Sequence, residues 1–178
     1  ATRAFRIFRI TLLVISGVIF SLCVFPLCGE RQRLALKASW AAALLDALGV
    51  EVEADLTHAV PGALLVANHI SWIDIYVINS ALPAAFVSKE EVRHWPLIGW
   101  LIAGVGTLFI ERDSRRHTHA VNRVTGDALA RGDVVAVFPE GATGDGTGLR
   151  NFHGSLLQPI VDLGGKVQPI VQRTSAAA

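Results

Sequence analysis

The chain opens with one long apolar run, and short apolar runs separated by turn residues follow it. The long run covers residues 10–29 and contains no charged side chain. As an α-helix it would extend about 30 Å, which matches the hydrocarbon core of a bilayer. The pattern predicts a membrane-anchoring helix. A cleaved signal peptide is the alternative, but bulky Leu27 stands near the end of the run and the first cluster of small residues comes only at 41–43.

A second helical pattern follows at residues 31–48, where apolar side chains recur at intervals of three and four. This helix lies either in the membrane interface, with Trp40 near the level of the headgroups, or against the rest of the chain. The pattern does not decide between the two. We therefore divide the chain into an N-terminal membrane-associated helical segment, residues 1–49, and a globular domain, residues 50–178.

The globular part alternates short apolar runs with helical stretches. The runs predict strands at 50–54, 63–67, 85–88, 107–110, 134–138 and 167–171. The helical stretches are 74–81, 96–104, 115–131 and 152–163. Alternation of this kind predicts an α/β fold, a mixed sheet flanked by helices, with the last strand at an edge because Pro169 interrupts it. The chain ends soon after this strand, so we expect the C-terminus to be truncated.

Composition and charge point to a membrane partner. Of the 178 residues, 52% are apolar and 17% charged, and the mean hydropathy is +0.47. The chain is therefore more hydrophobic than a soluble domain and less hydrophobic than a polytopic membrane protein. Residues 1–37 carry six basic groups against one acidic group, and the remainder carries ten against fourteen. Positive charge around the most apolar stretch favours anionic lipid headgroups and argues against nucleic acid. Cys23 and Cys28 both lie in or beside that stretch, so a disulfide framework is excluded.

Polar residues directly follow the apolar run ALLVA, in the segment NHISWID. The carboxyl end of a strand is where ligands bind in an α/β sheet. If a helix begins near Ser71 to Asp74, the Asp74 carboxylate can bond the His69 imidazole, fix its tautomer and leave the other ring nitrogen as a general base. The alternative is a purely structural His–Asp pair, with Ser71 as a helix N-cap.

Further strand ends carry charged groups. Glu140 follows VVAVF in the segment FPEG, Gly141 permits an unusual turn, and the loop ATGDGTG exposes N–H groups that can hold an anion. A tight turn with a solvated Glu140 is the alternative. Arg112 follows TLFI, where it can grip a phosphate or carboxylate, and Lys89 follows AFVS. We expect these groups to converge with His69 at one edge of the sheet.

The ordered set NHISWID, KEEVRHWPLIGWL, GTLFIER, FPEG and VQPIV resembles the glycerolipid acyltransferase family over about residues 50–171. NHISWID contains that family's HX4D motif. The resemblance implies direct transfer of a fatty acyl group, without cofactor or metal, from acyl-CoA or acyl carrier protein to the free hydroxyl of lysophosphatidic acid or a related lysophospholipid. It also implies phospholipid biosynthesis at the cytoplasmic face of the inner membrane. His69 would be the general base and Asp74 the carboxylate that orients it.

The resemblance implies binding roles for other residues. Arg112 would hold the acceptor's phosphate, Glu140 with Gly141 would help to bind its glycerol part, and Lys89 would lie near the thioester. Two departures stand out. The third motif continues as FPEGATGDG where many members have FPEGTRS, so an arginine is missing and a lyso-ornithine lipid stays open as acceptor. Gln168 stands where the family usually has proline.

Three other hypotheses remain. An acyl thioesterase would use the same pair to activate water, a lipid-binding module would bind without catalysis, and a metal hydrolase would use His69, Asp74 and Glu140 as ligands. His117 and His119 are two residues apart, face different sides of their predicted helix, and so do not form a metal pair.

Some residues have plain structural interpretations. His153 and Asp162 are expected to be surface or structural. Three tryptophans either line a groove for the acyl chain or belong to the core. These are Trp72, Trp95 and Trp100.

Overall fold

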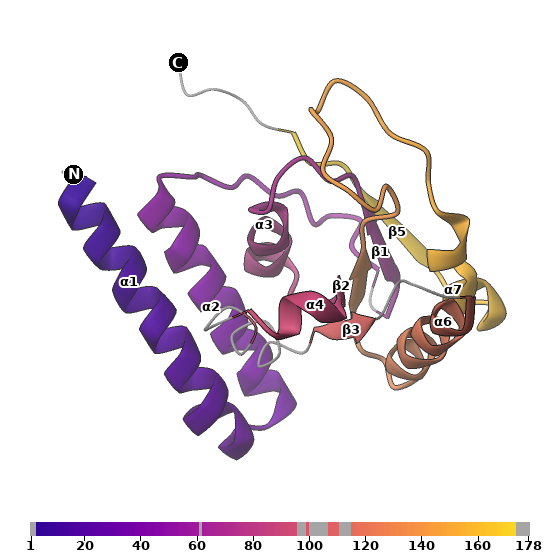
Figure 1. The fold of residues 1–178 in the computed structure, drawn as a ribbon, viewed down its shortest axis with the longest axis horizontal. Coiled ribbons are helices and arrows are strands. Elements are labelled where there is room, and N and C mark those ends of the chain that lie inside the picture. The colour runs from indigo at the N-terminus through magenta and orange to yellow at the C-terminus, as the bar shows by residue number, and fades with distance from the viewer. Residues whose placement is uncertain (1–2, 61, 96–98, 100–106, 111–114, 174–178) are drawn as a thin grey trace.

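The structure, a computed structural model, describes residues 3–60, 62–95, 99, 107–110 and 115–173, with side chains at all of these except 89, 110 and 115–121. Within these residues a five-stranded sheet has the order β3-β2-β4-β1-β5, with helices on both faces (Figure 1). The strands are β1 Leu64–Ala67, β2 Ala85–Lys89, β3 Leu108–Ile110, β4 Val135–Val137 and β5 Val167–Ile170. The predicted α/β class is confirmed, and β5 lies at an edge as expected.

The sheet is parallel at each recorded pairing, whereas a mixed sheet was expected. The predicted strand at 50–54 is wrong. Gly49 has φ +78° and Val50 donates to the carbonyl of Leu45, so this stretch completes the C-terminal cap of the preceding helix. Glu51, Glu53 and Ala54 are exposed beyond it, and Val52 is half-buried, so the stretch has no apolar face to bury in a sheet.

The described helices begin with α1 Arg3–Ile19, which continues as a π-helical turn Phe20–Val24 and a 3-10 turn Phe25–Leu27. The others are α2 Glu30–Leu48, α3 Asp74–Ala81, α4 Glu90–Arg93, α6 Arg115–Ala130, the 3-10 turn Gly154–Leu156 and α7 Gln158–Asp162. The prediction for 74–81 is confirmed at both ends. The helix predicted at 152–163 is broken, because Pro159 lacks an N–H and is suited to begin a new helix. The helix predicted at 96–104 falls outside the described residues apart from Gly99.

Alternation along the central strands gives the sheet two apolar faces. Leu64 on β1 packs toward α6 and α7, with Val135, Leu129 and Ile160 in the same cluster. Leu65, the next residue, faces the opposite way, in a cluster that includes Ile78 of α3. Both faces are therefore covered, as a parallel sheet requires.

The N-terminal helices α1 and α2 lie side by side and antiparallel, and α2 packs against α3 (Figure 1). Trp40 Nε1 donates to the carbonyl of Leu13 at 2.8 Å, so Trp40 lies between the helices. Lys37 Nζ donates to the carbonyl of Ala84, and burial lowers the pKa of Lys37 to about 8. Of the two placements considered for the second helix, the structure shows it packed on the rest of the chain.

Candidate active site

The candidate site lies where two neighbouring strands send the chain to opposite faces of the sheet. β1 and β4 are paired and parallel, so both end at the same edge. After β1 the chain enters α3 on one face, and after β4 it proceeds to α7 on the other. Such a switch point is where open α/β sheets bind ligands. His69 follows β1 here, and Glu140 follows β4.

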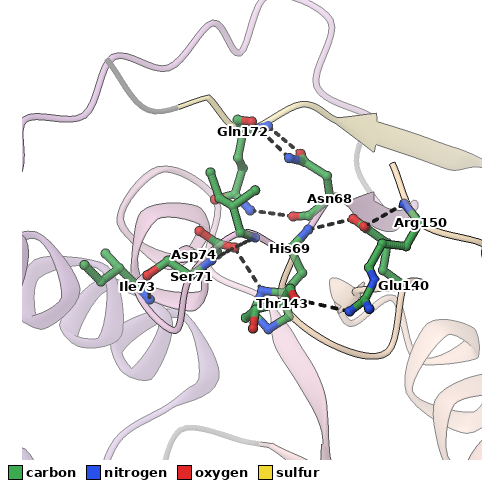
Figure 2. A network of polar contacts seen from close by, with 10 residues as sticks. Asn68, His69, Ser71, Ile73, Asp74, Glu140, Thr143, Arg150 and Gln172 are labelled. Carbon is green, nitrogen blue, oxygen red and sulfur yellow. Dashed lines mark hydrogen bonds and ion pairs between the residues drawn. The ribbon is translucent and has the colours of Figure 1, made fainter. Parts of the chain in front are cut away.

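The turn from β1 into α3 is built around one carboxylate oxygen. Asp74 Oδ2 accepts hydrogen bonds from the backbone N–H groups of Ile70 at 2.7 Å and Ser71 at 2.9 Å, and it lies 2.9 Å from Nδ1 of His69 (Figure 2). Because a carboxylate only accepts, the proton of the neutral imidazole lies on Nδ1. The predicted contact between His69 and Asp74 is therefore present, and it leaves the lone pair on Nε2.

The imidazole is held from several sides and still reaches the surface. Its ring stacks on Phe138, with centroids 4.1 Å apart and an interplanar angle of 13°. The side chain of His69 is 17% exposed and that of Asp74 is 5% exposed. Within the part of the chain that the structure describes, Nε2 has no hydrogen-bond partner. This is the arrangement of a general base with an orienting carboxylate.

Glu140 is buried, so the solvated turn considered as an alternative is wrong. Its Oε1 accepts the backbone N–H of His69 at 2.9 Å, and its Oε2 accepts the backbone N–H of Arg150 at 3.0 Å. The N–H of Gly144 donates to the carbonyl of His69 at 2.7 Å. The Glu140 carboxylate thus ties the turn after β1, residues 68–73, to the segment that follows the glycine-rich loop. Its predicted part in substrate binding stays a prediction.

Gly141 occupies a position that other residues would strain. Its φ is +71°, and an added Cβ would lie 3.0 Å from Cδ2 of His153. His153 donates its backbone N–H to Pro139 at 2.8 Å, which agrees with the structural role expected for it. The close approach keeps the chain turned back on itself directly after Glu140. Whether Gly141 also contacts substrate stays a prediction.

Two predicted binding residues remain open. Lys89 ends β2, and its side chain is not described; Arg112 lies outside the described residues, two positions after the end of β3. The order of parallel strands brings the carboxyl ends of β2 and β3 to the same edge as His69. Their roles stay predictions. No group of three or more metal-ligating side chains is found among the described residues.

Trp72 and Trp95 are not core residues. Trp72 is 57% exposed and meets Tyr76 edge to face, with ring centroids 5.9 Å apart. Trp95 is also more than half exposed, and Trp100 lies outside the described residues. Exposure of large rings beside the site is compatible with an apolar substrate, and the predicted groove stays a prediction.

Sequence reasoning missed several contacts of this site. Phe138 supplies a face for the imidazole, Arg150 is bonded to Glu140, and Gln172 is bonded to Asn68 across the end of the sheet (Figure 2). Phe138 could have been found, since a ring at the end of β4 faces the neighbouring strand end. No local signal marks Gln172, which is 104 residues from Asn68.

Comparisons with known proteins agree with the resemblance that the sequence motifs indicate. A family model described as Acyltransferase matches residues 49–173. The chain is 39% identical over 148 residues to a 1-acyl-sn-glycerol-3-phosphate acyltransferase of Neisseria gonorrhoeae, covering 83% of this chain and 57% of the relative. It is 43% identical over 140 residues to a lyso-ornithine lipid O-acyltransferase of Pseudomonas aeruginosa, covering 79% and 53%. The chain thus spans about half the length of these curated relatives.

A solved structure agrees in fold. The 1-acyl-sn-glycerophosphate (LPA) acyltransferase PlsC from Thermotoga maritima superposes with a TM-score of 0.65 at 24% identity, covering 91% of this chain and 73% of that one. At this identity the likeness concerns the fold. The family model, by contrast, matches well over half of the chain and includes both His69 and Asp74. The chain belongs to the acyltransferase family.

Proposed function

We propose that this chain transfers a fatty acyl group from a thioester of coenzyme A or acyl carrier protein to the free hydroxyl of a lysolipid at a membrane surface. The observation that carries the proposal is the His69–Asp74 pair, with Nδ1 bonded to the carboxylate and Nε2 without a partner among the described residues. Relatives named for lysophosphatidate-type and lyso-ornithine lipid acyltransferases support a lysolipid as the acceptor class.

In the proposed reaction, Nε2 of His69 takes the proton of the acceptor hydroxyl as its oxygen attacks the thioester carbonyl. Asp74 stabilises the imidazolium that forms. When the tetrahedral intermediate collapses, the carbon–sulfur bond breaks and the thiolate leaves, taking the proton from the imidazolium. The products are the acylated lipid and the free thiol, and His69 returns to its starting state.

Direct transfer fits the groups around the pair. Ser71 Oγ accepts a hydrogen bond from the backbone N–H of Ile73 at 3.3 Å within the turn before α3; the N-cap of that helix is Ile73, so the N-cap role considered for Ser71 is wrong. Cys23 and Cys28 lie in the N-terminal segment, away from β1. Among the described residues, none of these three side chains has a hydrogen bond to His69 or to another base that would activate it as a nucleophile.

The helix pair supports a membrane location. Residues 3–27 form a helical stretch long and apolar enough to cross a bilayer, judged by length and composition. One face of it carries six large apolar side chains at intervals of three and four, each about half exposed, which we call the apolar stripe. They are Phe5, Phe8, Leu12, Ile15, Ile19 and Leu22. We propose that this stripe binds lipid at the cytoplasmic face of the inner membrane.

The pairing of α1 with α2 limits how deeply the apolar stripe can enter the membrane. Arg9 and Asp46 form an ion pair at 2.6 Å across the two helices, and Glu30, Arg31 and Arg33 in the first turn of α2 are exposed. Carrying these charges into hydrocarbon is costly. The pair is therefore expected to lie with the stripe in the lipid and α2 toward the domain.

Acyl transfer is the direct test. Labelled acyl-CoA and acyl carrier protein thioesters are offered with lysophosphatidate, a lyso-ornithine lipid or lysophosphatidylethanolamine, in phospholipid vesicles. We expect the parent to form labelled diacyl lipid, and His69→Ala to lose at least about 100-fold in kcat. His58→Ala, in an exposed loop, serves as the matched control.

Three outcomes would overturn the proposal. If His69→Ala transfers at the parental rate, the assigned base is wrong. If the thioester is consumed equally fast with and without lysolipid, the same pair activates water and the chain is a thioesterase. Lipid binding without any conversion by the parent would indicate a binding module.

A further inference from the structure

A reciprocal set of hydrogen bonds joins Asn68 to Gln172 (Figure 2). Oδ1 of Asn68 accepts the backbone N–H of Gln172 at 2.7 Å, and Nδ2 of Asn68 donates to the backbone carbonyl of Gln172 at 3.0 Å. Nε2 of Gln172 in turn donates to the backbone carbonyl of Asn68 at 3.0 Å. We call these three bonds the amide clamp. They tie the residue before His69 to the segment after β5.

The amide clamp begins where the ladder between β1 and β5 stops. The last paired residues are Ala67 and Ile170. Asn68 is the next residue after Ala67. Its side-chain amide has a donor group and an acceptor oxygen, as a peptide group does. This side chain, and not the main chain of Asn68, makes the bonds to the backbone of the segment after β5. The main chain of Asn68 is thereby released to turn out of the sheet toward His69.

A main chain that leaves a sheet needs new partners for its polar groups. Here the partners come from two distant segments, the stretch after β4 and the stretch after β5. Gln172 takes the carbonyl of Asn68, Glu140 takes the N–H of His69, and Gly144 donates to the carbonyl of His69. The peptide groups on both sides of His69 are thus fixed independently of the bond between its ring and Asp74.

The side-chain oxygen of Gln172 indicates which half of this amide matters to the structure. Oε1 of Gln172 is buried, and no donor among the described residues reaches it. A buried acceptor without a partner costs stability, and an apolar side chain of similar size would avoid that cost. The useful property of Gln172 is therefore the donor that it directs at Asn68.

We propose that Asn68 and Gln172 are positioning residues for acyl transfer, which hold the main chain of His69 so that Nε2 meets the acceptor hydroxyl. This inference rests on the proposed function. The ring of His69 is oriented by Asp74 and Phe138, but the place of its Cα is set by the peptide groups beside it. A misplacement of about 1 Å at a reacting group costs on the order of 100-fold in rate.

Two variants exchange one NH2 group for an oxygen and leave the shape of the side chain almost unchanged. Asn68→Asp removes the bond donated to Gln172, and Gln172→Glu removes the bond donated to Asn68. Gln168→Glu is the matched control: it adds the same charge on β5, and among the described residues the Gln168 amide donates to the neighbouring Pro169 carbonyl. We expect kcat to fall about 10-fold to 100-fold in both test variants, with KM for either substrate changed less than about 3-fold, and the control to match the parent.

Gln172→Met separates positioning from general stability. It removes the donor together with the unsatisfied acceptor, so we expect its Tm to stay within about 4 °C of the parent while its kcat falls as in Gln172→Glu. If kcat falls only in proportion to a lowered Tm, and recovers at lower temperature, the clamp is merely structural and the inference fails.

Hydrogen exchange gives a readout that does not need activity. Peptides covering residues 66–74 are followed by mass spectrometry in the full chain. We expect faster exchange in Asn68→Asp and Gln172→Glu and parental exchange in Gln168→Glu. Unchanged exchange in both test variants overturns the inference, whether or not acyl transfer is detected.

The combined outcomes separate this inference from the proposed function. If hydrogen exchange is faster in the two test variants but the parent transfers no acyl group, the proposed function has failed, and the positioning role in acyl transfer fails with it. If the parent is active and exchange is faster but kcat is unchanged, the positioning inference alone is overturned.

Discussion

The turn after β1, residues 68–73, and the pair of helices α1 and α2 are stabilised by different kinds of contact. Around His69, specific hydrogen bonds hold the turn, and one oxygen of Asp74 alone lies within hydrogen-bond distance of three nitrogens. Between α1 and α2 the contacts are largely apolar, with the Arg9–Asp46 pair and the bond from Trp40 among the few polar ones.

The difference shows how one chain serves two tasks. Directional hydrogen bonds fix atoms to within a fraction of an ångström, as a base and its substrate require. Apolar packing is less directional, and it leaves the apolar stripe of α1 facing outward. Substitutions in the turn should therefore change the rate of reaction, and substitutions in the stripe should change where the protein resides.

The largest predicted effect is on vesicle binding, and it comes from substitutions in the apolar stripe. Leu12 and Ile15 are each about half exposed on α1. Replacing both by asparagine removes two side chains that are worth about 1.5–3 kcal/mol each when buried. We expect affinity for vesicles of phosphatidylethanolamine and phosphatidylglycerol to fall more than about 100-fold, measured by vesicle sedimentation, with the melting temperature little changed.

The control for the stripe lies on another surface. Val161 and Leu163, at and just after the end of α7, are exposed to a similar degree. The corresponding double asparagine variant should bind vesicles as the parent does. An equal loss in both double variants would show that binding follows overall hydrophobicity and not the stripe.

Lys37 joins the helix pair to the sheet, because its ammonium on α2 bonds the carbonyl of Ala84 just before β2. Burial lowers its pKa from 10.5 to about 8 in the folded chain. Between these two values the unfolded chain binds more protons, so the free energy of unfolding rises with pH, by up to about 3 kcal/mol. We expect this rise in urea unfolding of the parent, and its loss in Lys37→Met.

Lys166→Met is the control for that measurement, since Lys166 is exposed in the turn before β5. It should keep the parental rise in stability. A rise that persists in Lys37→Met would show that another group causes it.

A smaller effect is expected from Glu140→Gln, because Glu140 follows β4 and holds the main chain of His69. The amide keeps one acceptor but places an NH2 group against a backbone N–H, so one of two buried hydrogen bonds is lost, at a cost of about 1–3 kcal/mol. We expect kcat to fall about 10-fold as the main chain of His69 loosens, measured by the same transfer assay. Glu51→Gln, in an exposed loop, should behave as the parent, and full activity in Glu140→Gln would argue against a role for this carboxylate in holding His69.

Sequence reasoning succeeded where a short stretch contains both partners of a contact. His69 and Asp74 are five residues apart, and the step from an apolar strand to a helix brings them together in any fold that keeps that step. Sequence reasoning failed at residues 50–54. The apolar residues there predicted a strand, but Val50 belongs to the C-terminal cap of α2. The burial of Glu140 was likewise beyond local inference, since its partners come from distant segments.

The sequence by itself determined the α/β class, the apolar N-terminal helix and the pair of residues proposed to perform the chemistry, because each depends on neighbours along the chain. Only the tertiary structure decided that Glu140 supports His69, that Phe138 stacks on its ring and that Gln172 holds Asn68. The physical reason is the strand order, which places β4 and β5 on either side of β1. That order is set by the packing of the whole sheet, so no single segment encodes it.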